Sequence, residues 1–166
     1  MGQRLEQLSA ACHDALAADP GTEGRKKVCG LIQQVLTDKE FIATYLGDDV
    51  PERKVLYEDQ ELGFCILAHV NHGARQSTPH DHGPSWAIYG QAQGETIMSD
   101  WQLVEPASED KPGRVRLVRE YRLTPGMAYI YNEGDLHSPR RTGSTKLIRV
   151  EGRNLETIRR LAYEAI

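Results

Sequence analysis

The chain has 166 residues, of which 39% are hydrophobic and 27% charged, as is usual for one globular domain with a sizeable core. Its 20 basic and 24 acidic residues give a net charge of -4, so charge provides no reason to expect nucleic acid or a membrane surface as a partner. No apolar run approaches a membrane span and the first residues lack the apolar core of a signal peptide, so we expect a cytoplasmic protein.

The first part of the chain predicts helices. Apolar residues recur at helical spacing over residues 5–16 and 28–36, and Asp19-Pro20-Gly21 breaks the pattern between them. A third, short helix is expected over residues 39–46, closed by Gly47. We expect residues 1–50 to form a helical segment that packs on the strands that follow and supports them, without a role in chemistry.

From residue 54 onward the apolar period changes from helical to strand-like. Strands are expected over residues 62–70, 86–89, 95–104, 114–123, 127–131 and 145–150. Four arginines alternate with apolar residues in the fourth of these, which indicates an exposed strand face: Arg114, Arg116, Arg119 and Arg122. Asn154 can cap a closing helix over residues 155–165. The pattern predicts a mainly β fold at 51–152, with the helical segment 1–50 before it and a C-terminal helix within 153–166, all in one domain.

Two histidines lie two residues apart in His80-Asp81-His82, between Pro79 and Gly83. On a strand such residues share a face, so both imidazoles aim at one point and Asp81 points away. A third, His137, follows an apolar run and a turn over residues 132–135. A His-x-His pair alone is more often a surface or packing feature, but the strand and turn before His137 favour a shared metal site. Three neutral nitrogen ligands suit iron, copper, nickel or zinc.

These motifs resemble those of the cupins, whose barrels carry metal ligands on two conserved segments. The first cupin motif matches at Gly73, His80, His82 and either Gly90 or Gly94, but its Glu is missing. The second, which ends in Gly-x-x-His, matches at Gly134 and His137, with Asn132 where proline is usual. The resemblance implies a cupin double-stranded β-helix, or jelly-roll, barrel with N-terminal helices and a C-terminal helix. His80, His82 and His137 would be its metal ligands.

A site of three histidines resembles the thiol dioxygenase branch of the cupins, which includes cysteine and 3-mercaptopropionate dioxygenases. The likeness runs over residues 53–152 and implies that Arg53 binds the substrate carboxylate. Those enzymes keep a Ser-x-His-x-Tyr run after the third ligand, where this chain has Leu147, Arg149 and Glu151. Arg149 and Glu151 could form an alternative inward polar pair or be two solvated charges on an edge strand. The resemblance is therefore to a sister family of thiol-dioxygenase-like cupins.

Aromatic residues supply the remaining site candidates. Trp86 is expected to wall the substrate pocket. Tyr129 or Tyr131, on the strand that leads toward His137, could replace the missing tyrosine if it faces the metal, although packing is the more common role of such residues. His69 and His72 are expected to be structural.

Two functions from different classes follow. The first is an enzyme resembling cysteine dioxygenase, an oxidoreductase with mononuclear non-haem iron that oxidises a small thiol or other small anionic substrate with O2. The second is a non-catalytic cupin that binds or senses a small molecule, which the missing triad favours. A metal-dependent isomerase fits less well without the Glu ligand. Fe(II) is the expected cofactor, although zinc or nickel could occupy the metal site in a crystal. The resemblance to cupins also implies that a homodimer is a reasonable assembly.

Overall fold

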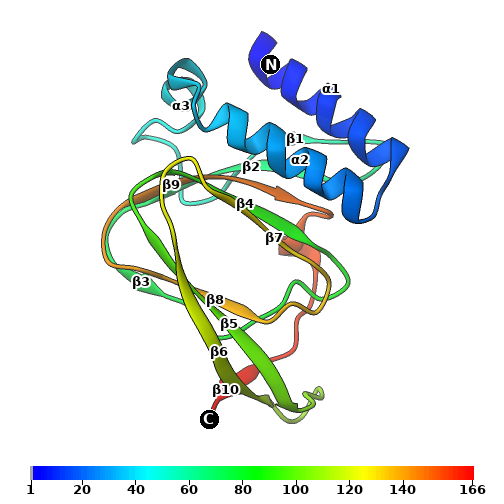
Figure 1. Cartoon of the computed structure of the whole chain (residues 1–166), viewed down its shortest axis with the longest axis vertical. Coiled ribbons are helices and arrows are strands. Elements are labelled where there is room, and N and C mark those ends of the chain that lie inside the picture. Colours follow the sequence, from blue (N-terminus) through cyan, green and yellow to red (C-terminus); the bar gives the residue numbers. More distant parts are fainter. Residues whose placement is uncertain (1) are drawn as a thin grey trace.

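The computed structural model describes residues 2–166, and Figure 1 shows a barrel of strands with the helices along one side. The helices are α1 (Gln3–Ala18), α2 (Thr22–Val35) and α3 (Lys39–Tyr45). The strands are β1 (Lys54–Glu58), β2 (Cys65–Asn71), β3 (Arg75–Gln76), β4 (Ala87–Gln93), β5 (Thr96–Glu105), β6 (Gly113–Leu123), β7 (Ala128–Tyr131), β8 (His137–Arg141), β9 (Thr145–Glu151) and β10 (Tyr163–Ala165).

Two five-stranded sheets form the barrel. One has the strand order β1-β2-β9-β4-β7 and the other the order β10-β6-β5-β8-β3. All neighbouring strands are antiparallel except β10 and β6. Strands that are distant in sequence, such as β2, β9 and β4, are therefore neighbours in space, which is the arrangement of a jelly roll. The predicted mainly β jelly-roll fold is confirmed.

The helices cover the outer face of the first sheet, as Figure 1 shows. Their apolar stripe packs with the outward side chains of this sheet in one core, which includes Leu5, Val28 and Ile32 from the helices and Ile88 and Ile148 from the strands. A Cβ at Gly90 would lie 2.5 Å from the side chain of Ile32, so the glycine lets α2 approach β4 closely. The three predicted helices are confirmed, and α3 begins at the Asp38 side chain, which accepts from two backbone N–H groups.

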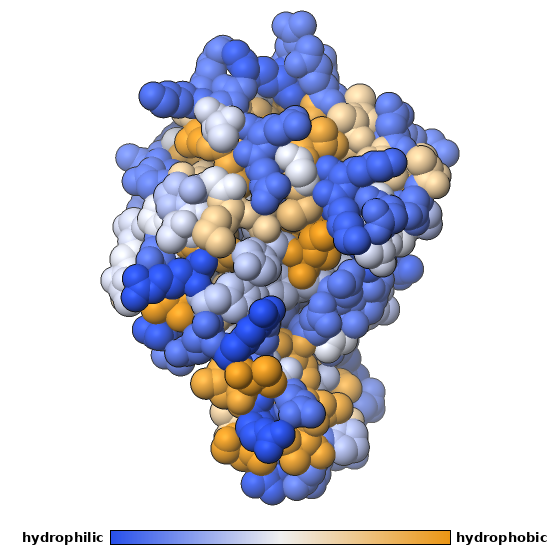
Figure 2. Space-filling model, in the orientation of Figure 1, coloured by the Kyte–Doolittle hydropathy of each residue, from blue (hydrophilic) through white to orange (hydrophobic). Residues whose placement is uncertain are grey.

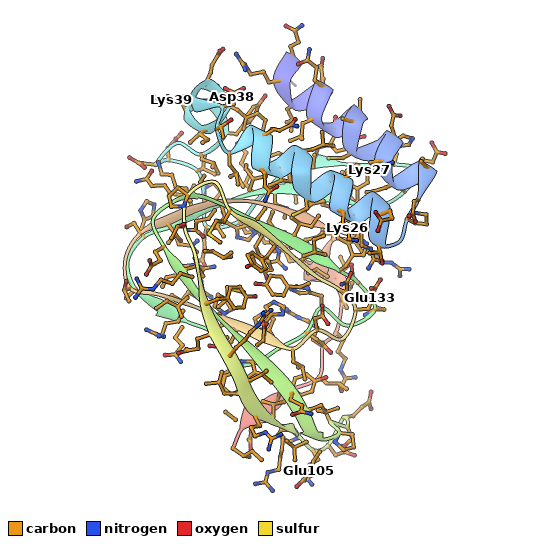
Figure 3. The ribbon with its side chains drawn as sticks, in the orientation of Figure 1. Lys26, Lys27, Asp38, Lys39, Glu105 and Glu133 are labelled. Carbon is orange, nitrogen blue, oxygen red and sulfur yellow. The ribbon has the colours of Figure 1, made fainter. Side chains whose placement is uncertain are left out.

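The inner faces of the two sheets enclose a second, smaller core. It is made of Ala87, Tyr89, Met98, Leu123, Tyr131 and Leu147. Figure 3 shows ring side chains filling the space between the sheets. Because successive strand residues point to opposite faces, Ile88 belongs to the helix-side core while Tyr89 points into the barrel.

Strand β9 lies in the middle of its sheet, between β2 and β4. The interpretation of Arg149 and Glu151 as solvated charges on an edge strand is therefore wrong. Their side chains are 13% and 1% exposed and point into the barrel, which leaves the inward polar pair as the correct alternative.

The C-terminal residues form no α-helix, so the predicted helix over residues 155–165 is wrong. Asn154 does cap a helical turn, but only Leu155–Thr157 is helical, as a 3-10 turn. Tyr163–Ala165 instead pairs in parallel with β6 at the sheet edge, and the Tyr163 hydroxyl donates to Asp81 at 3.1 Å. Leu161 of the expected apolar stripe stays 42% exposed. The expected apolar stripe has no surface to pack against, so pairing of residues 163–165 with β6 overrides the local helical pattern.

The hairpin of β5 and β6 extends away from the barrel. Glu105 marks its far end in Figure 3, and Figure 2 shows apolar side chains gathered there, among which Leu103, Val104, Leu117 and Val118 are exposed. The arginines of β6 expected on an exposed face are exposed. Among residues 2–166, no helix combines the length and the apolar character needed to span a membrane.

Candidate metal centre

Three histidines converge between the two sheets. Each of His80, His82 and His137 offers a ring nitrogen, and these nitrogens all lie within 4.8 Å of one another. The imidazole of His137 is 4.7 Å from that of His80 and 4.6 Å from that of His82, measured between ring centroids. His82 and His137 are fully buried. Distances of this size allow the three nitrogens to bind one ion.

Backbone contacts hold His80 against His137. The two residues exchange hydrogen bonds, His80 N–H to His137 carbonyl at 3.0 Å and the reverse at 2.9 Å, in an isolated antiparallel bridge. The His80–His82 segment is otherwise irregular, so the expected regular strand is not found, although both rings still face one point. Asp81 points away, as predicted, and its carboxylate accepts from the Gly83 N–H and the Tyr163 hydroxyl. Gly83, at φ 59°, allows the turn directly after His82.

The turn before His137 is tied to the helical segment. Arg25 of α2 donates to both carboxylate oxygens of Glu133 at 2.7 Å and to the Asn132 side chain at 2.9 Å. Figure 3 shows Glu133 at the barrel edge beside the start of α2. Gly134, at φ 79°, closes the turn. The helices thus position the loop that presents His137, which is support of the kind the sequence predicts.

The protonation state of the three rings suits a metal ion. Burial lowers the pKa of each imidazole below its ordinary value, and the positive charge of Arg149 acts in the same direction. The rings are therefore neutral near pH 7 and keep a lone pair. Nδ1 of His80 donates to the Thr78 carbonyl and Nδ1 of His137 to the Asp135 carbonyl, each at 2.9 Å, which directs both Nε2 atoms into the site.

His82 differs from the other two in its partners. Its Nδ1 is buried without a hydrogen-bond partner, while Nε2 lies 3.1 Å from the Tyr89 hydroxyl and 3.3 Å from the Arg149 guanidinium. Both groups can donate to the lone pair of Nε2. A metal ion bound at Nε2 would take the place of these two hydrogen bonds. The donor set of three neutral imidazoles fits a divalent transition-metal ion.

Tyrosines surround the histidines on one side. Tyr131 stacks on His137 with 4.1 Å between ring centroids, and the Tyr89 hydroxyl also lies 3.5 Å from His137 Nε2. Tyr131 shares a 2.6 Å hydrogen bond with Tyr121, whose hydroxyl donates to Asp100 at 3.1 Å. Tyr129 packs on Tyr121 and makes no ring contact with the three histidines. Tyr131 is therefore the better placed of the two expected tyrosines.

Tyr89 is a site residue that the sequence analysis did not single out. Tyr89 has the only side-chain hydroxyl within residues 2–166 that lies in hydrogen-bond range of His82 Nε2. Register gives the reason, because β4 places Tyr89 directly opposite Arg149 of β9 and Tyr129 of β7. Tyr89 is two residues after Ala87, so the two side chains share the inner face of β4. This alternation is the sequence feature that could have indicated Tyr89.

Arg149, Glu151 and Arg53 form a charged cluster beside the histidines. Arg149 lies over the Tyr89 ring at 4.5 Å, and its Nε is 3.2 Å from a Glu151 oxygen in an ion pair without hydrogen-bond alignment. The other Glu151 oxygen accepts from Arg53 at 3.0 Å. Arg53 also donates to Asn154 and Glu156. Arg53 thus reaches the cavity described next, but protein oxygens already occupy its guanidinium.

A cavity of about 720 Å³ opens beside the site, and His80, Tyr89, Arg53 and Arg149 are among the residues that line it. Five arginines and three glutamates contribute to its wall. The expected wall residue Trp86 lies elsewhere: it belongs to the helix-side core, where the Arg25 guanidinium covers its ring at 5.2 Å. A cavity with this charge favours an anionic ligand.

No protein-family model matches the sequence, and no curated protein matches it. Several solved structures are similar. The cupin domain of Cnp3 from Schizosaccharomyces pombe is 10% identical with a TM-score of 0.47, and the match covers 61% of this chain and 64% of that domain. KdgF from Halomonas sp. is 17% identical with a TM-score of 0.46, covering 64% and 82%.

A cupin-2 domain protein from Shewanella frigidimarina is 13% identical with a TM-score of 0.45, and the match covers 71% of this chain and 96% of that one. This chain thus spans less than two thirds of the Cnp3 domain and nearly all of the Shewanella protein. Strand order and register, rather than these likenesses, define the fold as a jelly-roll barrel with a possible three-histidine metal site between its sheets.

Proposed function

We propose that this protein is a mononuclear non-haem iron dioxygenase, resembling the three-histidine thiol dioxygenases, that oxidises a small thiol or other small anionic substrate with O2. The observation that carries the proposal is the convergence of three neutral histidine rings beside an arginine-lined cavity. Three neutral ligands leave the charge of a divalent ion uncompensated, so an anionic substrate would bind favourably beside it. The partners we propose are this substrate and O2.

The residues have distinct tasks in this proposal. His80, His82 and His137 would hold the iron, which when bound supplies the redox chemistry with O2. Arg149 provides positive charge within 3.3 Å of His82 Nε2 and orients an anion at the site. The Tyr89 hydroxyl, within 3.5 Å of two ligand nitrogens, can donate a hydrogen bond to the substrate or accept one from it. Tyr131 fixes the plane of His137 by stacking on it.

Oxygen uptake by iron-loaded protein tests the proposal. The protein is loaded with Fe(II) in the absence of air. It is then added to an oxygenated solution of one compound at a time, and an electrode records the O2 concentration. The compounds are cysteine, 3-mercaptopropionate, cysteamine and a diketone. We expect uptake with at least one anionic substrate. His137→Ala should abolish it and His72→Ala, a change at an exposed turn residue, should not. Metal analysis of freshly purified protein shows which ion occupies the site. The absence of uptake with all four compounds from fully loaded protein would contradict this substrate class.

A second candidate is a non-catalytic barrel that binds or senses a small anion. The observation in its favour is the replacement of the expected triad by Leu147, Arg149 and Glu151, in which two charged side chains pair with each other. A binding protein would take up its ligand in a manner that depends on the metal and would consume no O2. Calorimetry on zinc-loaded protein identifies which of these compounds bind, because zinc supports binding without redox chemistry. Oxygen uptake by the iron-loaded protein with those compounds then separates the two functions, since only the enzyme consumes O2.

A further inference from the structure

Arg141 is a cation without a protein partner in the wall of the cavity. It is the last residue of β8 and lies on the same face as His137 and Pro139. The preceding residue, Arg140, points outward toward Glu120. Within residues 2–166, Arg141 makes no ion pair and its Nε is buried without a hydrogen-bond partner. Arg141 is half-buried, and a buried N–H donor without an acceptor is costly, so its Nε lacks an acceptor that its surroundings would normally provide.

The charged neighbours of Arg141 do not neutralise it. Arg75 of β3 lies directly opposite it in register, and like charges in that position destabilise a sheet. Arg75 contacts Glu52, whereas Glu151 and Glu156 are bound by Arg53 and Arg149. All three glutamates of the cavity wall therefore have other partners, and none compensates Arg141.

His69 is a second unsatisfied group in the same wall. It lies on β2, and its Nε2 is buried without a hydrogen-bond partner. Burial lowers its pKa, and the charges of Arg149 and Arg141 lower it further, so the ring is neutral near pH 7. A neutral imidazole can donate one hydrogen bond through Nε2. Buried polar atoms without hydrogen-bond partners are uncommon, and four lie on residues of this cavity wall. Arg149 Nε and Glu151 Oε1 form an ion pair with each other, whereas Arg141 Nε and His69 Nε2 have no partner and point to a shared missing ligand.

We propose that Arg141 and His69 form a subsite that binds the carboxylate of the substrate. The guanidinium fork matches the two oxygens of a planar carboxylate, and His69 Nε2 would donate a further hydrogen bond to the same group. This inference rests on the proposed function in one respect: the other end of the substrate would reach the three histidines. It assigns the carboxylate to Arg141 instead of Arg53, whose donors are already used by Glu151, Asn154 and Glu156. The substrate class is therefore a small carboxylate with a second metal-binding group.

Calorimetry on zinc-loaded protein tests the subsite without any turnover, with succinate as probe and inorganic phosphate as comparison. We expect wild type to bind succinate more tightly than phosphate. Arg141→Met should weaken succinate binding by about tenfold or more, since charge-assisted hydrogen bonds are lost. Arg140→Met is the matched control, because it removes the neighbouring arginine on the outer face of the same strand. It should change the affinity by less than about twofold.

Two further variants keep the test decisive if Arg141→Met is unstable. His69→Leu should weaken succinate by about threefold or more, since one hydrogen bond is lost. His137→Ala, without bound metal, should still bind succinate, and His69→Leu in the same background should weaken that binding, so failure of the metal site is distinguishable from failure of the subsite. Absence of succinate binding to wild type, equal effects of Arg141→Met and Arg140→Met, or tighter binding of phosphate that Arg141→Met abolishes would each overturn the proposal.

Discussion

The phenol ring of Tyr131 stacks on the imidazole of His137, with 4.1 Å between ring centroids and 23° between the ring planes. Tyr131 belongs to β7 in the first sheet and His137 to β8 in the second, so this contact joins the two sheets at the site. The Tyr131 hydroxyl is hydrogen-bonded to the Tyr121 hydroxyl, which donates to Asp100. Tyr131 therefore belongs both to a hydrogen-bonded chain and to the packed inner core. The histidine site thus depends on the assembled barrel, whose two apolar cores include none of the three histidines.

Removal of one histidine should therefore remove the metal and leave the fold. His137→Ala, like the corresponding changes at His80 and His82, is expected to lose most of the bound metal, because two imidazoles hold a divalent ion much less tightly than three. Elemental analysis and circular dichroism of the same sample measure the two effects. His72→Ala, at an exposed turn residue, is the control and should retain the metal. Retention of stoichiometric metal by all three single variants would exclude the assigned ligands.

Glu151 should contribute far more to stability than Glu156, although both pair with Arg53. Glu151 is 1% exposed and also receives the Leu155 N–H and the charge of Arg149, whereas Glu156 is 71% exposed. Glu151→Gln leaves two adjacent arginines without their carboxylate and should lower the free energy of unfolding by about 3 kcal/mol. Glu156→Gln should lower it by less than about 1 kcal/mol. Urea unfolding of both variants checks the difference, and similar losses would argue against it.

Most of the fold could be predicted from the sequence, because long apolar strands and helices have clear periods. Strands β1, β3 and β8 were not predicted, since they are short or polar; β8, with the sequence His-Ser-Pro-Arg-Arg, has no apolar period. The C-terminal segment was predicted as a helix because its local pattern is amphipathic. Its pairing with β6 is a long-range contact that local pattern does not contain.

For the site, the spacing of the three histidines was informative and the surrounding residues were not. The position of β9 between β2 and β4 decides that Arg149 and Glu151 point inward, and only sheet topology reveals it. Similarly, a sequence shows that Tyr89 and Arg141 are strand residues without showing what lies opposite them. Trp86 was assigned to the wrong face because it comes just before β4 begins, where alternation gives no guide.

The metal-free protein should lose stability as the pH falls below about 6.5, the ordinary pKa of histidine in an unfolded chain. Burial keeps His69 neutral in the folded protein, and the same holds for His82 and His137. The unfolded state then binds more protons than the folded state, so the free energy of unfolding decreases with falling pH, by about 1 kcal/mol for each such residue one pH unit below 6.5. His13 acts in the opposite sense, because its hydrogen bond to Asp59 raises its pKa.

Urea unfolding of the metal-free protein at about pH 7.5 and about pH 5.5 measures this effect, since the midpoint tracks stability. His69→Leu should reduce the loss of stability between the two pH values. His72→Leu, at an exposed residue, should leave it unchanged. A loss that is equal in wild type and His69→Leu would show that His69 takes up a proton in the folded state.

Free cysteine should be a poor substrate even with iron bound. In the resembling dioxygenases the Ser-x-His-x-Tyr run orients substrate and oxygen, and here Leu147, Arg149 and Glu151 occupy the aligned positions. Arg149 is paired with Glu151 and cannot accept a proton, so it offers charge where a histidine would offer a general base. Loss of such preorganised groups commonly lowers the rate by about 100-fold, on the order of 3 kcal/mol. Oxygen uptake with cysteine, compared with 3-mercaptopropionate at matched iron content, measures the effect. Rapid conversion of cysteine to its sulfinic acid would mean that Tyr89 and Arg149 perform the work of the missing triad.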